Sequence, residues 1–398
     1  MGFLSLISSH RKLTFNKVII AVFLLIYVGL YFDEYLPLIK LSYALLMVGA
    51  LYEIYSSRRI RYSPFIILTI TFLIFGFFSL IWAVNPTSVI NSSILLLKSS
   101  FIAIAFVQLI KDESDVKFAL FWLFISGIIF SIIYLGNINL VDLGGERITT
   151  TGEDDLENIN VVAMIVSFSF VYFFYEYFTT KKIVNLVFSL VSLIVTILLG
   201  SRKSILVILL SIIFVFYKSS LKLKVKVVLF CLASVLVITT LLPQDYLQFV
   251  SERLLGLGFG AEYSDSVDAA DQIRTDLLRN GISYFLHRPV FGYGLYNFSI
   301  VNGQNTGIFL YSHNNFIEIL VGCGLIGFMI YYTLYILIYR NFKKSSNLLA
   351  KNFVYLILFM LLFNHIAIVV ILDRFVWILL ALLYSYSYIS KSEYLKMR

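Results

Sequence analysis

Residues 268–327 read DAADQIRTDLLRNGISYFLHRPVFGYGLYNFSIVNGQNTGIFLYSHNNFIEILVGCGLIG, and most of this stretch is too polar to lie inside a lipid bilayer. Residues 268–288 carry apolar side chains at roughly helical spacing and predict an amphipathic helix, which Pro289 ends. Gly-Tyr-Gly at 292–294 predicts a turn, and a polar loop follows it. Ser-His-Asn-Asn at 312–315 then begins a helix that continues into apolar sequence. This order places an imidazole where water meets membrane.

The composition excludes a soluble globule, because 60% of the 398 residues are hydrophobic and only 14% are charged. A helix needs about 20 apolar residues to cross a bilayer core of roughly 30 Å. The candidate runs, each bounded by charged or turn residues, are 17–32, 36–55, 64–84, 88–110, 116–135, 159–178, 183–200, 204–217, 225–242, 313–339, 352–372 and 374–390. We therefore predict an all-α polytopic membrane protein with about 12 transmembrane helices, forming a single transmembrane domain over 1–398.

The distribution of basic residues predicts the orientation. With the N-terminus inside, 21 of the 31 lysines and arginines fall in cytoplasmic segments, whereas the short outward loops hold only Arg147, Arg202, Lys203 and Arg374. Both termini are therefore expected in the cytoplasm, and the first apolar run, which lacks a cleavage site, is expected to be the first span. The net charge of +8 comes from small clusters at membrane edges and gives no support to nucleic-acid binding.

Two outward segments are long enough to carry chemistry, namely 136–158 and 243–312, and the second would complete the active site as a large helical extracytoplasmic loop between helices 9 and 10. A site on that side cannot use cytoplasmic ATP, so the substrate must bring the energy. An activated lipid-linked sugar meets this requirement. Cys231 and Cys323 lie in apolar runs, and no cluster of acids or histidines resembles a metal site, so we expect no disulfide, metal or cofactor.

Arg202 and Lys203 lie in the turn between the seventh and eighth runs. The eighth run, 204–217, would form only about 21 Å of helix, so the turn is expected below the outer surface. Two recessed cations need an anionic partner, and a diphosphate headgroup at the lipid interface would supply one. The alternative is a snorkelling or acid-paired turn.

Other basic residues are open to two interpretations. Arg274, on the amphipathic loop helix, and Arg147, near several acids, could bind an anion or form ordinary salt bridges. Arg279 and Arg288 are interpreted as solvated or helix-end charges. Lys98 lies near the middle of the fourth run, where an unpaired base is costly, and it could be functional or neutralised by a carboxylate or helix carbonyls.

His313 is a candidate general base, because a neutral imidazole can accept a proton near pH 7 and a helix start disfavours its cationic form. Alternatively, it is a structural residue at a helix start that the preceding serine caps. Asn314 and Glu318 lie four residues apart on one helical face and are expected to interact, with Glu318 orienting, substrate-binding or structural. His365, in the eleventh run, is expected to form interhelical hydrogen bonds, although a functional role is also open.

Several of these pieces occur together in one order. They are Lys98 in ILLLKSS, Arg147 in GERITTTG, Arg202 in LLGSRKS, Arg274 in QIRTDLL, the turn HRPVFGYGLYNF at 287–298, and SHNNFIEILVGCGLIG at 312–327. This pattern, within the predicted layout of twelve spans and a large late loop, resembles the O-antigen ligase and O-antigen polymerase superfamily of bacterial envelope-glycan enzymes. The last two motifs are the most specific. Lys203 departs from the pattern, since small residues are common at that position of the family.

The resemblance implies a metal-independent glycosyltransferase at the outer face of the cytoplasmic (inner) membrane. Its partners would be an undecaprenyl-diphosphate-linked oligosaccharide donor, a glycan acceptor and membrane lipids, with room for a chain-length regulator. Arg202 and Arg274 would hold the diphosphate, and His313 would take the proton from the attacking sugar hydroxyl. The further candidates for substrate binding are Lys203, Arg147, Lys98, Asn314 and Glu318.

Three functions remain open at this point. The preferred one is a polymerase that joins lipid-linked repeat units into an O-antigen, capsule or exopolysaccharide chain. The second is a ligase that moves a finished glycan to lipid A core or another acceptor. The third is a flippase or other transporter of lipid-linked glycan, which is less favoured because the charged residues gather outside the membrane helices.

Overall fold

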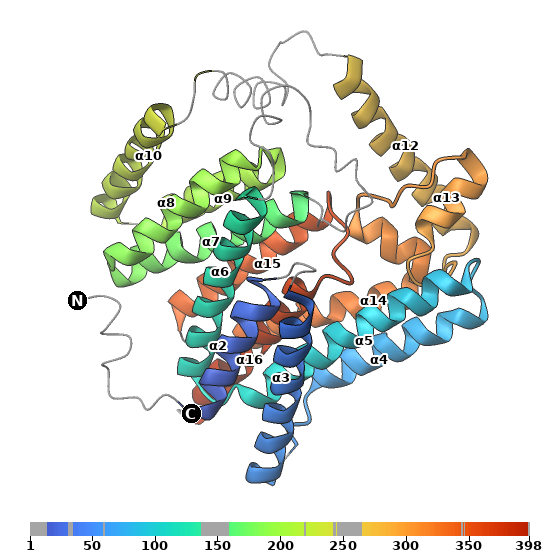
Figure 1. Cartoon of the computed structure of the whole chain (residues 1–398), viewed down its shortest axis with the longest axis horizontal. Helices are drawn as coiled ribbons and strands as arrows, with labels where there is room; N and C mark the ends of the chain where they lie inside the picture. Colours follow the sequence, from blue (N-terminus) through green and yellow to red (C-terminus); the bar gives the residue numbers. More distant parts are fainter. Residues whose placement is uncertain are drawn as a thin grey trace. The chain divides into compact units, whose positions relative to one another are not determined.

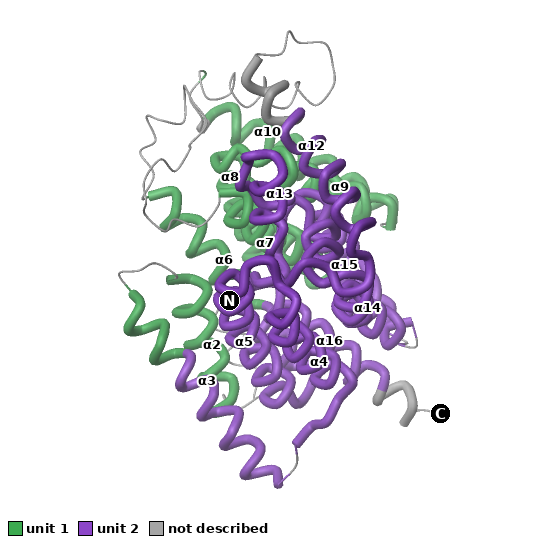
Figure 2. The backbone as a smooth tube through the Cα atoms, turned by 90° about the vertical axis from the view of Figure 1, so that its right-hand side faces the viewer, with its two compact units in different colours: residues 1–42, 121–263 green, residues 43–120, 264–398 purple. Residues whose placement is uncertain are grey.

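The computed structural model of the chain describes residues 14–30, 35–58, 60–136, 159–218, 220–241, 244, 265–343, 345 and 347–396. Within these residues it contains fourteen α-helices, one short 3-10 helix (η2) and no strand, which confirms the predicted all-α class. The chain forms two compact units (Figure 2), one of residues 1–42 and 121–263 and the other of residues 43–120 and 264–398. We call them unit 1 and unit 2.

Each of the twelve predicted runs coincides with a helix. Among the described residues, seven spans are long and apolar enough to cross a membrane: α3 (Leu36–Ser57), α4 with η2 (Pro64–Ile81), α5 (Pro86–Leu109), α6 (Glu113–Gly136), α7 (Ile159–Thr180), α14 (Asn315–Lys343) and α15 (Leu348–His365). The other five helices in these runs are α2 (Phe15–Tyr27), α8 (Ile183–Leu198), α9 (Arg202–Lys218), α10 (Leu221–Leu241) and α16 (Arg374–Lys396). A multi-pass membrane protein follows, and the number twelve stays a prediction.

Unit 1 is built around α7, whose apolar side chains are almost all buried. α8 packs along α7, and α9 contacts both. Aromatic rings fill this core: Phe170 stacks on Phe174 with centroids 5.1 Å apart, and Phe230 of α10 lies 5.2 Å from Phe174. The connection between α8 and α9 is short and turns at Gly200, which has a φ of 62°. Arg202 therefore becomes the first residue of α9.

In unit 2, α4 and α5 lie side by side and pack with α14 and α16 (Figure 1). The centre of this packing is aromatic. The rings of Phe72 and Tyr331 are 5.4 Å apart, and Trp377 lies 6.4 Å from Phe72 and 6.0 Å from Tyr331. All three side chains are fully buried. This core fixes α14, the helix that follows His313.

α14 is interrupted at Gly324, where φ is 63° and ψ is −168°. The break leaves the carbonyls of Val321 and Gly322 without their usual helical donors. They accept hydrogen bonds from the N–H groups of Tyr293 and Gly294, each at 2.9 Å. The Pro-x-x-Gly-x-Gly turn thus supplies the main-chain hydrogen bonds that the break in α14 leaves unmade.

Two glycines make this contact possible. A Cβ at Gly324 would lie 2.2 Å from the carbonyl oxygen of Val290, and one at Gly292, where φ is 70°, would lie 2.4 Å from the carbonyl oxygen of Val321. Side chains at either position would push the two backbones apart. The glycines of the two motifs are therefore required by the same contact.

The corner between α4 and α5 covers the other side of the turn. The Trp82 indole N–H donates to the carbonyl of Phe291 at 3.1 Å. The main-chain N–H of Val84 donates to the carbonyl of Tyr293 at 3.0 Å. The hydroxyl of Ser79 accepts from the N–H of Leu295 at 3.0 Å. The turn at 289–295 is therefore held on both sides.

The remaining part of the polar stretch is more helical than the sequence suggested. The predicted amphipathic helix is α12 (Asp265–His287), and its end before Pro289 agrees with the prediction. The polar loop expected after the turn instead contains a short helix, α13 (Phe298–Thr306), which ends at Gly307 with a φ of 80°. Phe298 and Val301 of α13 are buried, and their burial stabilises the helix. Its other residues are mostly polar, so the sequence alone predicts a loop here.

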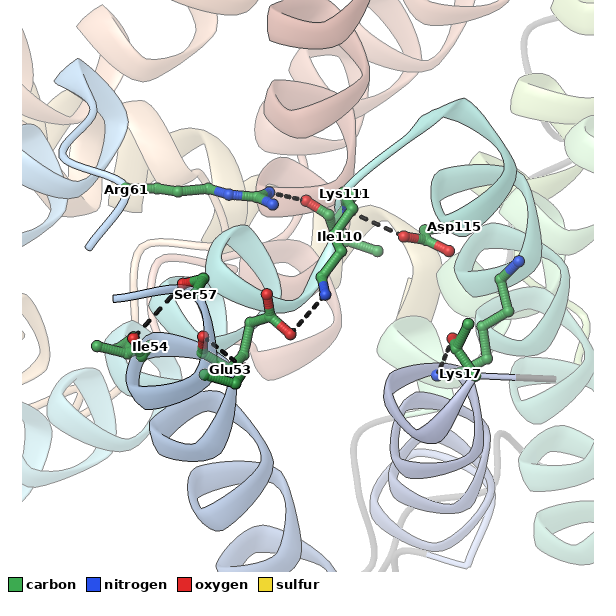
Figure 3. Close-up of polar contacts among 10 residues, drawn as sticks. Lys17, Glu53, Ile54, Ser57, Arg61, Ile110, Lys111 and Asp115 are labelled. Carbon is green, nitrogen blue, oxygen red and sulfur yellow. Dashed lines mark hydrogen bonds and ion pairs between the residues drawn. The ribbon is translucent and has the colours of Figure 1, made fainter. Parts of the chain in front are cut away.

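At the start of α4 and the end of α5, charged side chains join neighbouring helices of unit 2 (Figure 3). Lys111 pairs with Glu53 of α3 at 2.8 Å, and its main-chain N–H donates to the carboxylate of Asp115 at 2.9 Å. The guanidinium of Arg61 donates to the carbonyl of Ile110. These contacts tie the end of α3 and the start of α6 to α5.

Candidate functional site

The segment before α14 is held by a helix cap, which is not the serine that the alternative interpretation of His313 named. The N-cap is Asn314, whose side-chain oxygen accepts from the N–H groups of Phe316 at 3.0 Å and Ile317 at 3.1 Å. Ser312, the cap in the alternative interpretation of His313, instead bonds to the main chain of Asn314 through its hydroxyl, at 2.8 Å and 3.3 Å. An asparagine one residue before the helix reaches two of its unsatisfied N–H groups, and for this reason Asn314 rather than Ser312 is the cap.

Glu318 holds the same segment from inside the fold. Its side chain is 2% exposed, and its carboxylate accepts from the main-chain N–H of Ser312 at 3.1 Å. The expected interaction between Asn314 and Glu318 exists, but it is the main-chain bond from the N–H of Glu318 to the carbonyl of Asn314, at 2.9 Å. The carboxylate thus reaches back past the cap to a residue two positions before it, and both bonds hold the segment that enters α14.

His313 lies between Ser312 and Asn314, which these bonds hold in place, and has a left-handed conformation with a φ of 52°. It precedes the cap and so lies outside the first turn of α14, where we had expected it. Its half-buried ring packs against Tyr311, with centroids 4.0 Å apart and planes at 40°. A non-glycine residue held at positive φ is strained, and such strain persists only where the surroundings impose it.

Two tyrosines of this region were not selected from the sequence: Tyr311, whose ring packs on His313, and Tyr296, whose hydroxyl is close enough to Tyr311 and Glu318 to be influenced by them. Tyr296, which also has a positive φ of 58°, is half-buried, and burial together with Glu318 and Tyr311 raises the pKa of its hydroxyl. It therefore stays neutral at ordinary pH. Its carbonyl accepts from the hydroxyl of Ser88 on α5, at 3.0 Å. Tyr296 lies two residues after the Gly-Tyr-Gly turn and Tyr311 lies directly before the Ser-His-Asn-Asn motif. These positions are the signals that could have found them.

A buried hydrogen-bond network supports the start of α14. Asn315 accepts from the N–H of Val370 at 2.9 Å and donates to the hydroxyl of Tyr332 at 3.2 Å. His365, fully buried at the end of α15, contacts the same hydroxyl through Nδ1 at 3.0 Å and the hydroxyl of Tyr335 through Nε2 at 3.2 Å. The prediction that His365 forms interhelical hydrogen bonds is confirmed.

The helix that carries Arg274 packs on α14. Leu277 of α12 forms an apolar cluster with Ile317, Val321 and Phe298. Arg274 lies one turn before Leu277 and on the same face, and its side chain is half-buried. The structure thus places Arg274 on the face of α12 that meets the start of α14.

Lys98 lies on the helix of the fourth run, as predicted. It lies in the middle of α5, but its side chain is exposed. Its role, functional or neutralised, stays a prediction. The buried face of α5 carries small polar and apolar residues, such as Ser99 and Leu96, and Lys98 lies outside it.

The remaining predicted residues belong to unit 1. Arg202 and Lys203 are the first two residues of α9 and are both half-buried. α9 has 17 residues, or about 26 Å of helix, so it is longer than the predicted 14-residue run. This weakens the argument that the turn is recessed. Arg147 lies outside the described residues.

Within the described part of the chain, no group of three or more His, Cys, Asp or Glu side chains is arranged to hold a metal ion. The site in unit 2 presents a half-buried imidazole that packs on Tyr311, on a strained segment that the buried Glu318 carboxylate holds. Such a group can accept or donate a proton at a fixed position.

Comparison with known families decides the class. The family described as "Putative O-antigen polymerase" matches residues 12–258, more than half of the chain, and the family described as "O-Antigen ligase" matches residues 186–332, which include His313. The chain belongs to the O-antigen polymerase and ligase superfamily. A search of curated proteins finds no match. As a member of this superfamily, the chain is a membrane-associated enzyme of O-antigen assembly, of the glycosyltransferase type, that acts on lipid-linked glycan.

Proposed function

We propose that this enzyme is a polymerase that joins undecaprenyl-diphosphate-linked oligosaccharide repeat units at the outer face of the cytoplasmic membrane. The observation that supports it best is the way His313 is mounted. The residue before His313, Ser312, is held by the carboxylate of Glu318, and the residue after it, Asn314, caps α14. His313 itself is only half-buried. A general base needs this combination of a fixed position and access to substrate.

In the proposed reaction, His313 accepts the proton of a sugar hydroxyl on the acceptor. The hydroxyl oxygen then forms a bond to the anomeric carbon of the donor glycan, and the bond from that carbon to the diphosphate oxygen breaks. Undecaprenyl diphosphate leaves with the electron pair. Arg202 and Arg274 offset the charge that develops on this leaving group, which is the role that a metal ion would otherwise take.

The side of the membrane follows from the charges in the sequence, since 21 of the 31 basic residues fall in segments predicted to be cytoplasmic. A single cysteine in place of Gln304, which is exposed on α13, should react with a membrane-impermeant reagent in intact cells. One in place of Lys343, exposed at the end of α14, should react only after lysis. The opposite labelling would overturn the proposed side.

A ligase is the second candidate, because the ligase family covers the segment around His313. Purified enzyme in detergent separates the two. A polymerase given only the lipid-linked repeat unit makes a ladder of longer lipid-linked glycans, since one substrate is both donor and acceptor. A ligase makes product only when lipid A core is added. A transporter makes neither, and that result would overturn the enzyme assignment.

A further inference from the structure

A hollow of about 380 Å³ lies in unit 2, apart from the His313 site. Its lining consists of Trp82 and the run 288–292, which contains the Pro289 end of the turn. None of His313, Asn314 and Glu318 lines it. Its volume is near the lower end of the range for small-molecule sites, which is about 300–1,000 Å³.

The walls of the hollow are fixed by hydrogen bonds that do not depend on a ligand. The Trp82 indole N–H donates to the carbonyl of Phe291, and the two rings meet edge to face with centroids 5.3 Å apart. The N–H of Gly292 donates to the carbonyl of Arg288 at 3.2 Å, and that of Leu325 donates to the carbonyl of Pro289 at 2.8 Å. The hollow is therefore formed in advance.

Apolar side chains at and beside the hollow are exposed. Phe291 is 50% exposed, Val290 is 49% exposed, and Ile81, the last residue of η2, is 78% exposed. Trp82 follows directly at the end of a predicted span, which is the depth where tryptophan is enriched in membrane proteins. These surfaces fit contact with lipid better than contact with water.

Arg288 supplies the charge. It is the sole ionisable residue of the lining, its guanidinium lies 4.7 Å from the centre of the Tyr293 ring, and among the described residues no acidic side chain pairs with it. A guanidinium binds phosphate oxygens through two parallel hydrogen bonds. An apolar hollow with one cation at its rim matches a ligand with an acyl chain and a single phosphate.

We propose that this hollow binds an anionic phospholipid of the membrane, with its phosphate on Arg288 and the start of an acyl chain against Trp82 and Phe291. The proposal goes beyond the proposed polymerase reaction and does not depend on it. The polyprenyl-diphosphate donor fits less well for two reasons. It carries more charge than one arginine offsets, and its reacting carbon must reach His313, which does not line the hollow.

Trp82 allows a direct test. Purified enzyme is reconstituted in phosphatidylcholine vesicles that contain either phosphatidylglycerol or phosphatidylcholine brominated in the acyl chain, and tryptophan quenching is measured. The difference between the wild type and Trp82→Phe isolates the signal from Trp82. We expect brominated phosphatidylglycerol to be preferred about five- to tenfold, the scale of one charge-assisted contact near a membrane. Arg288→Gln should remove the preference and Arg288→Lys should keep part of it, whereas Arg279→Gln, a matched loss of an exposed arginine on α12, should leave it unchanged.

Two measurements keep the proposal falsifiable if Arg288→Gln folds poorly. In wild-type protein, the preference should shrink as salt rises, because an exposed charge is screened. Farnesyl diphosphate, a soluble isoprenoid diphosphate, should not abolish the preference for brominated phosphatidylglycerol when it is added at a lower concentration than that lipid. Equal quenching by both lipids would mean ordinary lipid contact and would overturn the proposal, as would displacement by dilute farnesyl diphosphate, which would assign the hollow to a donor-type lipid.

Discussion

The two ends of the helices in unit 2 are held by different kinds of contact. At the end near His313, the turn 289–295 joins α14 and the α4–α5 corner mainly through main-chain hydrogen bonds, such as that from Tyr293 to Val321 at 2.9 Å. At the other end, charged and amide side chains make the contacts. Lys111 pairs with Glu53, and Gln108 exchanges two hydrogen bonds with the main chain of Arg61, at 3.0 Å and 3.3 Å.

The difference shows which end has to be exact. A main-chain hydrogen bond has no rotatable side chain between the two backbones, so it fixes their separation and demands glycine where they touch. A side-chain ion pair tolerates small shifts and is partly screened by water and salt. We therefore expect substitutions near His313 to change activity or folding strongly and those at the opposite end to change stability slightly.

The largest effect is expected at the break in α14. Gly324→Ala forces a side chain into the carbonyl of Val290 and disfavours the positive φ, so it should lower the free energy of unfolding by about 2–5 kcal/mol. Gly307→Ala is the matched control, because Gly307 also has a positive φ but no atom within 4 Å of its added Cβ. It should cost only about 1–2 kcal/mol. Thermal unfolding in detergent measures both, and equal losses would show that the main-chain docking contributes nothing.

His313 should give the next largest effect, on turnover. His313→Ala should lower turnover about a hundredfold or more, the scale of a lost general base, with expression and donor binding nearly unchanged. Because a protonated imidazole cannot accept a proton, wild-type turnover should rise with pH across the range in which imidazoles titrate, and the variant should lack this rise. Substantial activity with an unchanged pH profile in His313→Gln would make the residue a structural one.

Arg202 and Arg274 should affect use of the donor. Loss of one charge-assisted contact to a diphosphate costs about 1.5–3 kcal/mol, so Arg202→Ala and Arg274→Ala should each weaken donor use roughly tenfold to more than a hundredfold. Lysine should restore only part of it, because the planar fork is lost. Arg279→Ala, on the exposed face of the same helix as Arg274, is the control. Normal donor kinetics in both alanine variants would refute the assignment.

Glu318 should act through position. Glu318→Ala leaves the buried N–H of Ser312 without its acceptor, at a cost of about 1–3 kcal/mol, and should lower turnover about tenfold by loosening the segment that carries His313. Glu318→Gln keeps an acceptor oxygen and should retain most of the turnover. If the glutamine variant is as impaired as the alanine variant, the carboxylate itself takes part in the chemistry.

The sequence predicted the helices well because apolar runs and prolines act locally. The end of α12 before Pro289 and the helix in each apolar run follow from neighbouring residues alone. α13 was missed because the burial of Phe298, which favours it, depends on partners on other helices, such as Leu277 of α12 and Ile317 of α14. The break at Gly324 was missed for the same reason, since the turn that fills it lies some thirty residues earlier.

The candidate site was predicted in part. His313 and Glu318 stood out because titratable residues are rare in apolar sequence, and the structure places them in one framework. Tyr296 and Tyr311 did not stand out, because tyrosine is abundant in this chain, with 27 copies. The exposure of Lys98 also could not be read from its position, since a residue at the centre of a run can point to either face.

The smallest effects are expected at the end of unit 2 opposite His313, and there the partner's burial should decide between two lysines. Lys111 pairs with Glu53, whose side chain is 8% exposed, while Lys117 pairs with Glu113, whose side chain is 27% exposed, at 2.7 Å. Lys117→Ala removes an i,i+4 pair and should cost about 0.3–0.5 kcal/mol. Lys111→Ala should cost more, about 1 kcal/mol, because it leaves a largely buried carboxylate without its cation. Thermal unfolding with and without high salt measures the order, and turnover should stay within about twofold of wild type in both, since main-chain contacts hold the His313 end. A large loss of turnover in Lys111→Ala would show that the two ends are coupled through α5.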